Sequence, residues 1–163
     1  MTQCFVSIGS NINKAKNIKS ALNALCEMFG VLDISPICET PAVGFEGDDF
    51  YNLVVSFDSE FPAHAIFEKL REIEFAHGRE LNSQKFSPRQ LDLDLLLYGN
   101  AIVNDEKLKL PRSDIENYTF VLQPLANLAP DLIHPILKKS YGEMLQSHVL
   151  IESTLSHDDL MNF

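Results

Sequence analysis

The sequence predicts one α+β domain, built as a ferredoxin-like antiparallel sheet with its helices on one face and a C-terminal extension. The 163 residues are enough for a single domain, 1–163, and too few for two ordinary ones. The predicted elements follow the order strand, helix, strand, strand, helix, strand. Two of these strands have one unbroken apolar row and one row that mixes polar and apolar residues. One face of the sheet is therefore expected to pack against helices, which leaves the other face for chemistry.

Residue spacing defines the elements of the first half of the chain. Ile18, Leu22 and Leu25 recur at helical spacing, and Gly30 is suited to a C-terminal cap. Pro36 cannot donate to a ladder, which favours an edge position for its strand. The predicted elements are a buried strand at 3–8 closed by the turn residues Gly9-Ser10-Asn11, a helix at 14–29, a strand at 31–38 and a loop at 40–49.

A strand over residues 50–58 and a helix that follows it are predicted next. Along residues 50–58, one alternate row is entirely apolar: Tyr51, Leu53, Val55 and Phe57. Pro62 is well placed to start a helix that ends at Gly78. Glu74 falls inside the apolar stripe of that helix rather than opposite it, so an acid at this position needs a reason, and pairing with a neighbouring arginine of the helix is one interpretation.

The second half of the chain continues with a polar, basic loop over 79–90 and a strand over 91–98. Period two places Leu91, Leu93, Leu95 and Leu97 on one face of this strand, and Asp92 and Asp94 on the other. The remaining predictions are a strand at 101–103 that forms a hairpin with its neighbour, helices at 117–128 and 141–149, and an acidic tail that frays after about residue 150.

Composition excludes several classes of partner. The net charge of −10, with only 13 Lys and Arg, argues against a nucleic-acid surface. The three cysteines show no metal-ligand or CxxC spacing, so reduced thiols in the cytoplasm are expected. No basic leader and no apolar run of about 20 residues is present, so no membrane association is expected. We expect a cytoplasmic monomer.

Asp92 and Asp94 form the candidate metal site. Residues two apart on one strand face stand about 7 Å apart, close enough to share hard cations and to repel each other when unpaired. Mg²⁺ prefers a few carboxylates combined with phosphate oxygens and water, so this pair is suited to a metal–triphosphate site. Two solvated strand acids are the alternative interpretation of these residues taken alone.

The basic loop immediately before these acids supplies candidate phosphate ligands. Arg79, Lys85 and Arg89 lead toward the same end of the strand, where they could clamp phosphate in place of a Walker-type loop. The sequence has no G-x-x-x-x-G-K-[ST] motif. Each basic residue taken singly could also be an ordinary surface charge.

At this point the sequence resembles the 6-hydroxymethyl-7,8-dihydropterin pyrophosphokinases of folate biosynthesis. The resemblance runs from about Phe5 to Pro130, and the Pro-Arg-x-Leu-Asp-Leu-Asp string is its most specific part. The matching segments are Ser7-Ile8-Gly9-Ser10-Asn11, Glu39-Thr40-Pro41 with Gly44 and Asn52, Ser87-Pro88-Arg89-Gln90-Leu91-Asp92-Leu93-Asp94, Leu110-Pro111-Arg112 and Phe120-Val121-Leu122-Gln123-Pro124-Leu125.

The resemblance implies a reaction and a set of roles. Pyrophosphate would pass from ATP to the hydroxymethyl group of 6-hydroxymethyl-7,8-dihydropterin, releasing AMP, with two Mg²⁺ ions held by Asp92 and Asp94. The implied catalytic residues are Arg79, Arg89, Asp92 and Asp94. The implied pterin-binding residues are Thr40, Pro41, Val43, Phe50, Asn52, Asp92 and Phe120. The implied nucleotide-binding residues are Glu74, Arg79, Lys85, Arg89, Leu95 and Arg112. Loops 40–49 and 79–90 are expected to act as lids.

Three positions depart from the family pattern. Leu81 and Tyr118 stand where better-known members carry arginine, and Arg112 replaces a histidine. Because Leu81 and Tyr118 lie in or near the predicted lids, they bear on loop closure and rate. Two alternatives therefore stay open, a slow or inactive pterin- or nucleotide-binding paralogue and, from Asp-x-Asp alone, a magnesium nucleotidyltransferase that releases pyrophosphate.

Overall fold

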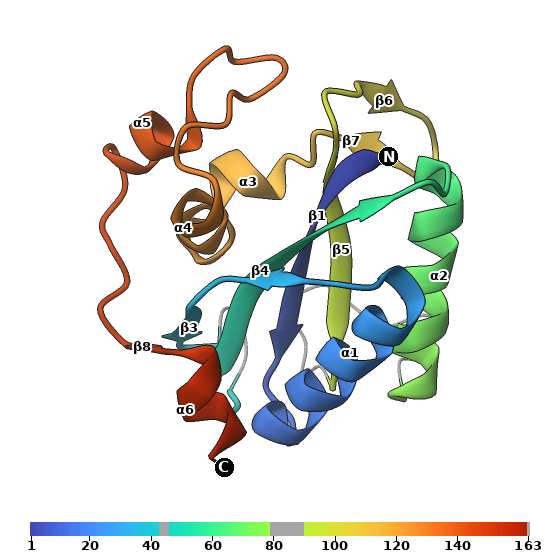
Figure 1. Ribbon diagram of the computed structural model, residues 1–163. Helices are drawn as coiled ribbons and strands as arrows, with labels where there is room; N and C mark the ends of the chain where they lie inside the picture. The colour runs from blue at the N-terminus through green and yellow to red at the C-terminus, as the bar shows by residue number, and fades with distance from the viewer. Residues whose placement is uncertain (43–45, 79–89, 163) are drawn as a thin grey trace.

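The computed structural model describes residues 1–42, 46–78 and 90–162. Five strands form the path β5-β1-β4-β3-β8, and β2 also pairs with β4 (Figure 1). Their bounds are β1 Thr2–Ser10, β2 Asp33–Ile34, β3 Ile37–Thr40, β4 Phe50–Ser59, β5 Asp92–Tyr98 and β8 Thr154–Leu155. Every pairing in this sheet is antiparallel, which confirms the predicted fold class.

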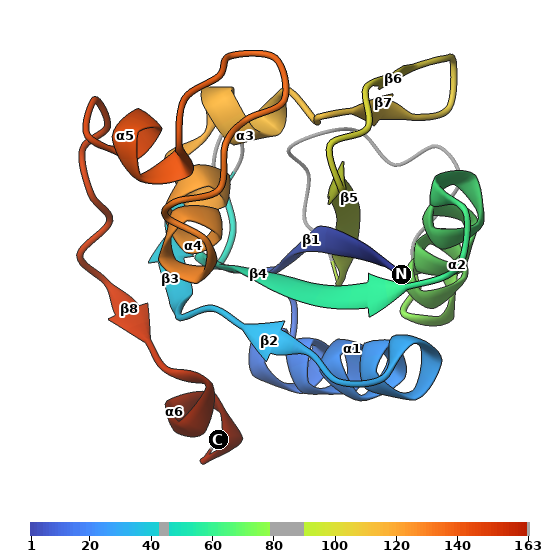
Figure 2. The same ribbon diagram turned by 45° about the horizontal axis from the view of Figure 1, so that its top comes forward.

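Helices cover both faces of the sheet. Two of the predicted helices, α1 (Lys14–Phe29) and α2 (Ala63–Ala76), share one face, and a third, α4 (Thr119–Leu128), packs on the other (Figure 2). The prediction that the second face is left for chemistry therefore needs correction, because α4 covers β4 and β3. The smaller helices are α3 Asp114–Asn117, α5 Tyr141–Leu145 and α6 His157–Met161.

The alternation predicted for β4 is confirmed by two hydrophobic core clusters, the first on the sheet face of α1 and α2 and the second on the face of α4. Tyr51, Leu53, Val55 and Phe57 pack with α1 and α2 in the first cluster. Val54 points the opposite way and packs with Leu122 and Leu125 of α4 in the second cluster. A strand buried on both faces is held firmly along its length, and β4 is such a strand.

The leucine row of β5 changes face, contrary to the prediction. Leu91, Leu93 and Leu95 join the first core cluster, whereas Leu97 joins the second together with Leu96. The register between β1 and β5 shifts between Phe5 and Val6, which is a β-bulge. A bulge inserts one residue and so reverses the alternation beyond it.

Three other predictions differ from the structure. The strand expected at 101–103 does not pair with β5: β6 (Val103–Asn104) instead pairs with β7 (Lys109–Leu110) in a separate sheet. Gly9 and Ser10 belong to β1 rather than to a turn. The tail expected to fray forms β8, which pairs with β3, and α6, whose Leu160 is fully buried in the first core cluster.

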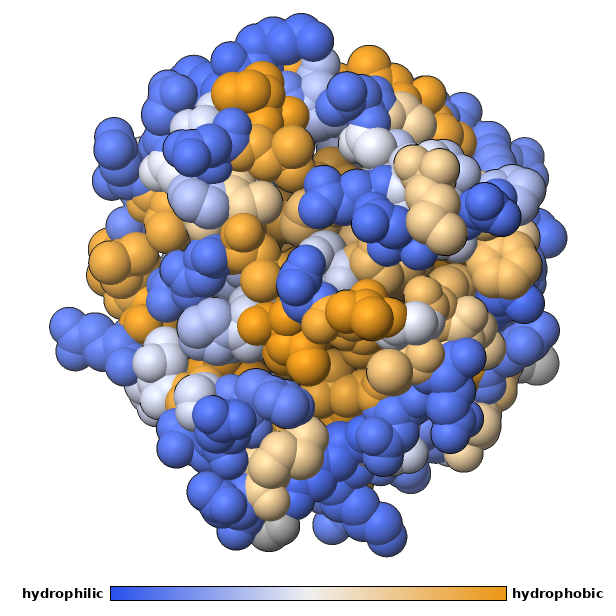
Figure 3. Space-filling view, in the orientation of Figure 1, coloured by the Kyte–Doolittle hydropathy of each residue, from blue (hydrophilic) through white to orange (hydrophobic). Residues whose placement is uncertain are grey.

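The surface carries both apolar and hydrophilic side chains. In the space-filling view, apolar surface lies near the middle of the face and hydrophilic side chains surround it (Figure 3). Within the described ranges, no helix combines the length and the apolar character needed to cross a bilayer.

Candidate active site

Gly9 brings Asn52 and Asp92 together at one end of the sheet. The backbone of Gly9 pairs with Asn52 of β4 on one side and with Asp92 of β5 on the other. A Cβ added to Gly9 would lie 2.9 Å from Asn52 Oδ1 and 3.9 Å from Asp92 Cβ. The two polar side chains therefore flank the space where Gly9 has no side chain. A strand position without a side chain lets a ligand approach the backbone closely.

Asp94 lies on the same strand face and connects the cluster to a half-buried cation. It pairs with Ser7 of β1, and its Oδ1 lies 3.6 Å from Arg112 Nη2. Arg112 Nε also donates to Asp114 Oδ2 at 3.1 Å. Burial by itself lowers the pKa of Arg112, but the charges of Asp94, Asp114 and Asp92 outweigh it and raise the pKa above its ordinary value. Arg112 therefore stays protonated and faces both acids of the pair.

Polar side chains continue the cluster across β4 and β3, and two aromatic rings stack at the start of α4. Asn52 Nδ2 donates to Thr40 Oγ1 at 3.4 Å, and Thr40 pairs with Phe50 in the ladder between β3 and β4. Phe120, at the start of α4, stacks on Tyr118 with ring centroids 5.0 Å apart and planes 22° apart. Such aromatic faces, combined with an amide and a hydroxyl, can hold a planar, hydrogen-bonding ring.

Ser10 at the end of β1, with Asn11 and Lys14 shortly after it, contacts the described ends of both neighbouring loops. Ser10 Oγ donates to the carbonyl of Gln90 at 2.5 Å, and buried Asn11 donates through Nδ2 to the carbonyl of Asp48 at 3.2 Å. Lys14 adds a second contact to the first loop by donating to the carbonyl of Asp49 at 3.1 Å. The ends of two loops distant in sequence are thus fixed beside the Gly9 cluster.

Comparison with known proteins matches residues 5–130 to the family model described as 7,8-dihydro-6-hydroxymethylpterin-pyrophosphokinase. The chain belongs to this pyrophosphokinase family. A relative from Methylorubrum extorquens with the name 2-amino-4-hydroxy-6-hydroxymethyldihydropteridine pyrophosphokinase is 36% identical over 137 residues, 82% of this chain and 86% of the relative. One from Aquifex aeolicus with the same name is 30% identical over 152 residues, 92% of this chain and 94% of the relative.

A solved structure of similar fold is the Plasmodium falciparum HPPK-DHPS wild type with SDX-DHP. Its TM-score is 0.69 at 12% identity, and the match covers 90% of this chain. The same match covers 43% of the Plasmodium falciparum chain. This likeness supports the fold alone.

The structure of the pyrophosphokinase brings part of the predicted site together. Asn52, Asp92, Asp94 and Arg112 form one connected group, with Thr40 bonded to Asn52. Pro41 follows Thr40 directly at the end of β3. The other predicted site residues Val43, Arg79, Lys85 and Arg89 lie outside the described residues, as does the departure at Leu81.

Two residues predicted to bind the nucleotide, a role that stays a proposal, are buried in the core. Leu95 is 2% exposed and packs in the first cluster, on the face opposite to Asp92 and Asp94. Its side chain is therefore directed away from the acids. Glu74 is 1% exposed, which confirms the predicted burial, and its Oε2 accepts the backbone N–H of Leu93 at 2.9 Å.

The close approach of Asn52 and Asp92 to Gly9 does not follow from the sequence prediction, because Gly9 is predicted there to belong to a turn. A glycine that directly follows alternating strand residues often marks a close approach of backbone or ligand, and that signal was available. The loop contacts of Ser10 and Asn11 could not be found in this way, since their partners are 80 and 37 residues away in the sequence.

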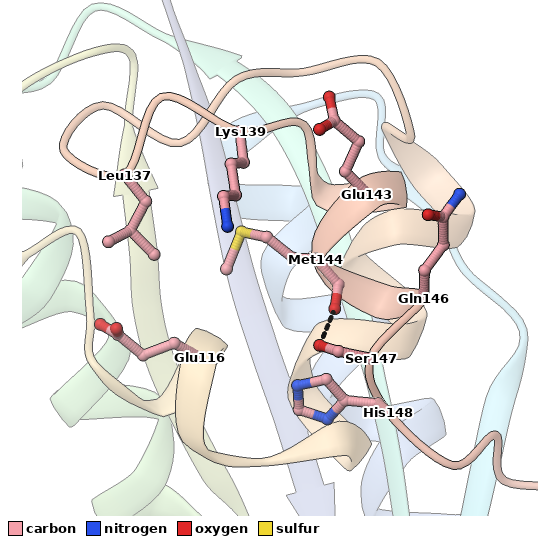
Figure 4. A pocket seen from close by; sticks show the side chains of 8 residues that line it. All are labelled: Glu116, Leu137, Lys139, Glu143, Met144, Gln146, Ser147 and His148. Carbon is pink, nitrogen blue, oxygen red and sulfur yellow. Dashed lines mark hydrogen bonds between the residues drawn. The ribbon is translucent and has the colours of Figure 1, made fainter.

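A separate open pocket of about 450 Å³ lies between α3, α5 and the preceding loop (Figure 4). Its charged lining residues are Glu116, Lys139 and Glu143, and Ser147 beside them donates to the carbonyl of Met144 at 3.0 Å. None of the predicted site residues that the structure describes lines it. The mixed charge of its lining does not favour an anion such as ATP, and the active site is better assigned to the Gly9 cluster.

Proposed function

We propose that this pyrophosphokinase transfers the terminal pyrophosphoryl group of ATP to the hydroxymethyl oxygen of 6-hydroxymethyl-7,8-dihydropterin. The new bond joins that oxygen to the β-phosphorus, the bond from the β-phosphorus to the α–β bridging oxygen breaks, and AMP leaves. The observation that carries this proposal is the placement of Asn52 and Asp92 on either side of Gly9, with Asp94 next along the strand. Family membership supports the same chemistry.

Asp92 and Asp94 are the proposed holders of Mg²⁺. Both side chains are half-buried on the same face of β5. In the ranges 1–42, 46–78 and 90–162, no group of three or more His, Cys, Asp or Glu could hold a metal ion by itself. A two-carboxylate donor set fits Mg²⁺, which takes its other ligands from phosphate and water. When bound, Mg²⁺ neutralises charge on the phosphates and aligns them for displacement.

The remaining residues of the site have proposed roles in binding and orientation. Asn52 and Thr40 hydrogen-bond the pterin edge, Phe50 and Phe120 stack on the ring, and Arg112 donates to the phosphates. The carboxylate of Asp92 or Asp94 is placed to receive the hydroxymethyl proton. The roles predicted for Pro41, Val43, Arg79, Lys85 and Arg89 stay proposals, as do a single domain over 1–163, a monomeric state and a cytoplasmic location.

The product nucleotide tests the reaction. Purified protein with ATP, Mg²⁺ and the reduced hydroxymethylpterin should form AMP in proportion to the pterin consumed. Asp94→Ala should abolish this, while Asp58→Ala, which removes an exposed strand acid of β4, should not. Release of ADP would contradict pyrophosphoryl transfer, and release of pyrophosphate without pterin consumption would indicate a nucleotidyltransferase.

A slow or inactive binding paralogue is the second candidate function. It is favoured by Tyr118, whose ring stacks on Phe120 where better-known members carry arginine. Calorimetry with the pterin and a non-hydrolysable ATP analogue would measure binding without turnover. Tight binding together with negligible AMP formation would support this candidate, and a rate increase in Tyr118→Arg would identify the departure responsible.

A further inference from the structure

Glu74 is a buried carboxylate held against the backbone of the candidate metal-binding strand. It belongs to α2, is 1% exposed, and accepts the backbone N–H of Leu93 through Oε2 at 2.9 Å. Arg71, three residues earlier on the helix, places Nε 3.7 Å from Oε1. Burying an ionised acid is costly unless it is paired, and a bond from a carboxylate to a backbone N–H is among the stronger kinds. The hydrogen bond from the Leu93 N–H therefore helps to offset the cost of burying the Glu74 carboxylate.

The bonded N–H lies between the two proposed Mg²⁺ ligands. Leu93 is the residue that separates Asp92 from Asp94, and β5 is the first strand on the path of the sheet. β1 pairs with β5 on one side, and the N–H of Leu93 is bonded to a side chain of α2. In an antiparallel pair, the N–H groups of alternate residues point away from the partner strand. Glu74 thus occupies the position that a further strand would otherwise take.

We propose that Glu74 is a positioning residue, whose carboxylate fixes the backbone of β5 at Leu93 and thereby the directions of the Asp92 and Asp94 side chains. The Leu93 side chain is anchored in the first core cluster, so a fixed peptide on either side of it leaves the two acids little freedom. The inference rests on the proposed function of Asp92 and Asp94. It assigns Glu74 a contact within the protein, in place of the nucleotide contact expected from the sequence.

Hydrogen exchange of the ligand-free protein tests the backbone contact. In Glu74→Ala the Leu93 amide should exchange at least tenfold faster than in the wild type, measured relative to the amides of β1. Glu74→Gln keeps an acceptor and should retain most of the protection, which guards against an alanine variant that fails to fold. Glu72→Ala removes an exposed acid from the same helix and should change nothing. Equal Leu93 exchange in Glu74→Ala and Glu72→Ala would overturn the proposal.

Titration with Mn²⁺ alone tests the consequence for the acids. Paramagnetic broadening of the Asp92 and Asp94 amides should require about tenfold more Mn²⁺ in Glu74→Ala than in Glu72→Ala. In steady-state assays kcat should fall in Glu74→Ala with little change in the KM for ATP. A rise confined to that KM would instead assign Glu74 to the nucleotide and overturn the proposal. Should the wild type form no AMP, the proposed function fails, while the exchange result still decides the role of Glu74.

Discussion

Gly9 separates Asn52 from Asp92, and the absence of a side chain there is a requirement of the proposed pterin site. A methyl group at this position would lie 2.9 Å from Asn52 Oδ1 and would displace that amide from its bond to Thr40. Gly9 contributes by leaving the space between Asn52 and Asp92 free of a side chain. A glycine in a strand weakens it slightly, and here the gain is a close approach to the backbone.

We therefore expect Gly9→Ala to raise the KM for the pterin by tenfold or more, about 1.4 kcal/mol of binding free energy, with a smaller effect on the KM for ATP. Gly142→Ala is the matched control, because its added Cβ would lie 3.0 Å from the carbonyl of Pro130, which belongs to no part of the proposed site. Steady-state kinetics and thermal unfolding of both variants provide the measurement. Equal pterin KM values in the two variants would contradict the assigned role of Gly9.

The three cysteines are expected to differ sharply in reactivity. Cys4 and Cys38 are fully buried and Cys26 is exposed. Burial, followed by the charge of Asp58, raises the pKa of Cys4 to about 12, and burial raises that of Cys38 to about 11. Since the thiolate is the reactive form, a thiol reagent at pH 8 should modify one cysteine in the native protein and three in denaturant. Rapid modification of two or more in the native state would show that the sheet opens.

At the scale of elements, His134 holds together the loop that precedes α5. Its Nδ1 accepts the backbone N–H groups of Ile136 and Leu137 at 3.1 and 3.0 Å, so this nitrogen cannot carry a proton. Burial lowers the pKa of His134, and the charge of Glu116 offsets only part of this. A lowered pKa in the folded state means that the unfolded chain takes up the proton first as the pH falls.

Stability contributed by His134 is accordingly present above the ordinary histidine pKa of about 6.5 and is lost as the pH falls below it. We expect the free energy of unfolding to fall more between pH 7.5 and pH 5.5 in the wild type than in His134→Asn, whose amide oxygen can replace Nδ1 as acceptor. Urea unfolding at the two pH values measures this difference. Parallel pH dependence in both proteins would argue against a role for His134 protonation.

Elements with strong local signals could be predicted from the sequence, and contacts between distant segments could not. Helix α1 begins and ends where its apolar spacing and Gly30 place it. The alternation in β4 and the buried position of Glu74 were equally visible. The bulge in β5 could not be predicted from the sequence, because its only signal is the register of β5 against β1. In the candidate site, Asp92, Asp94 and Asn52 could be predicted from family motifs, whereas the Arg112–Asp94 contact depends on a return of the chain to β5.

At the scale of the whole molecule, the end of the chain closes the fold. β8 extends the sheet at β3, and Gln123 of α4 exchanges two hydrogen bonds with the backbone of Ile151, at 3.0 and 2.7 Å. Leu160 of α6 then packs in the first core cluster beside α1. The segment after residue 150 is thus bonded to both layers of the protein.

Leu160→Ala should lower the free energy of unfolding by about 2–5 kcal/mol, the usual cost of truncating a buried leucine. Met161→Ala, which shortens an exposed neighbour, is the matched control and should have little effect. Denaturant unfolding followed by circular dichroism measures both. A similar loss in the two variants would mean that α6 contributes no core contact in solution.

The contacts of two loop ends with the consecutive residues Ser10 and Asn11, at the end of β1, have a consequence for protein engineering. Ser10 is bonded to the end of one loop and Asn11 to the end of the other. Because Ser10 and Asn11 are consecutive, a graft that changes the backbone here to fit one transplanted loop also shifts the residue that contacts the other loop. Chimeras of this enzyme should therefore transfer both loops together with the end of β1 and Asn11. A loop transplanted alone would lack the residue of its own parent that contacts its end.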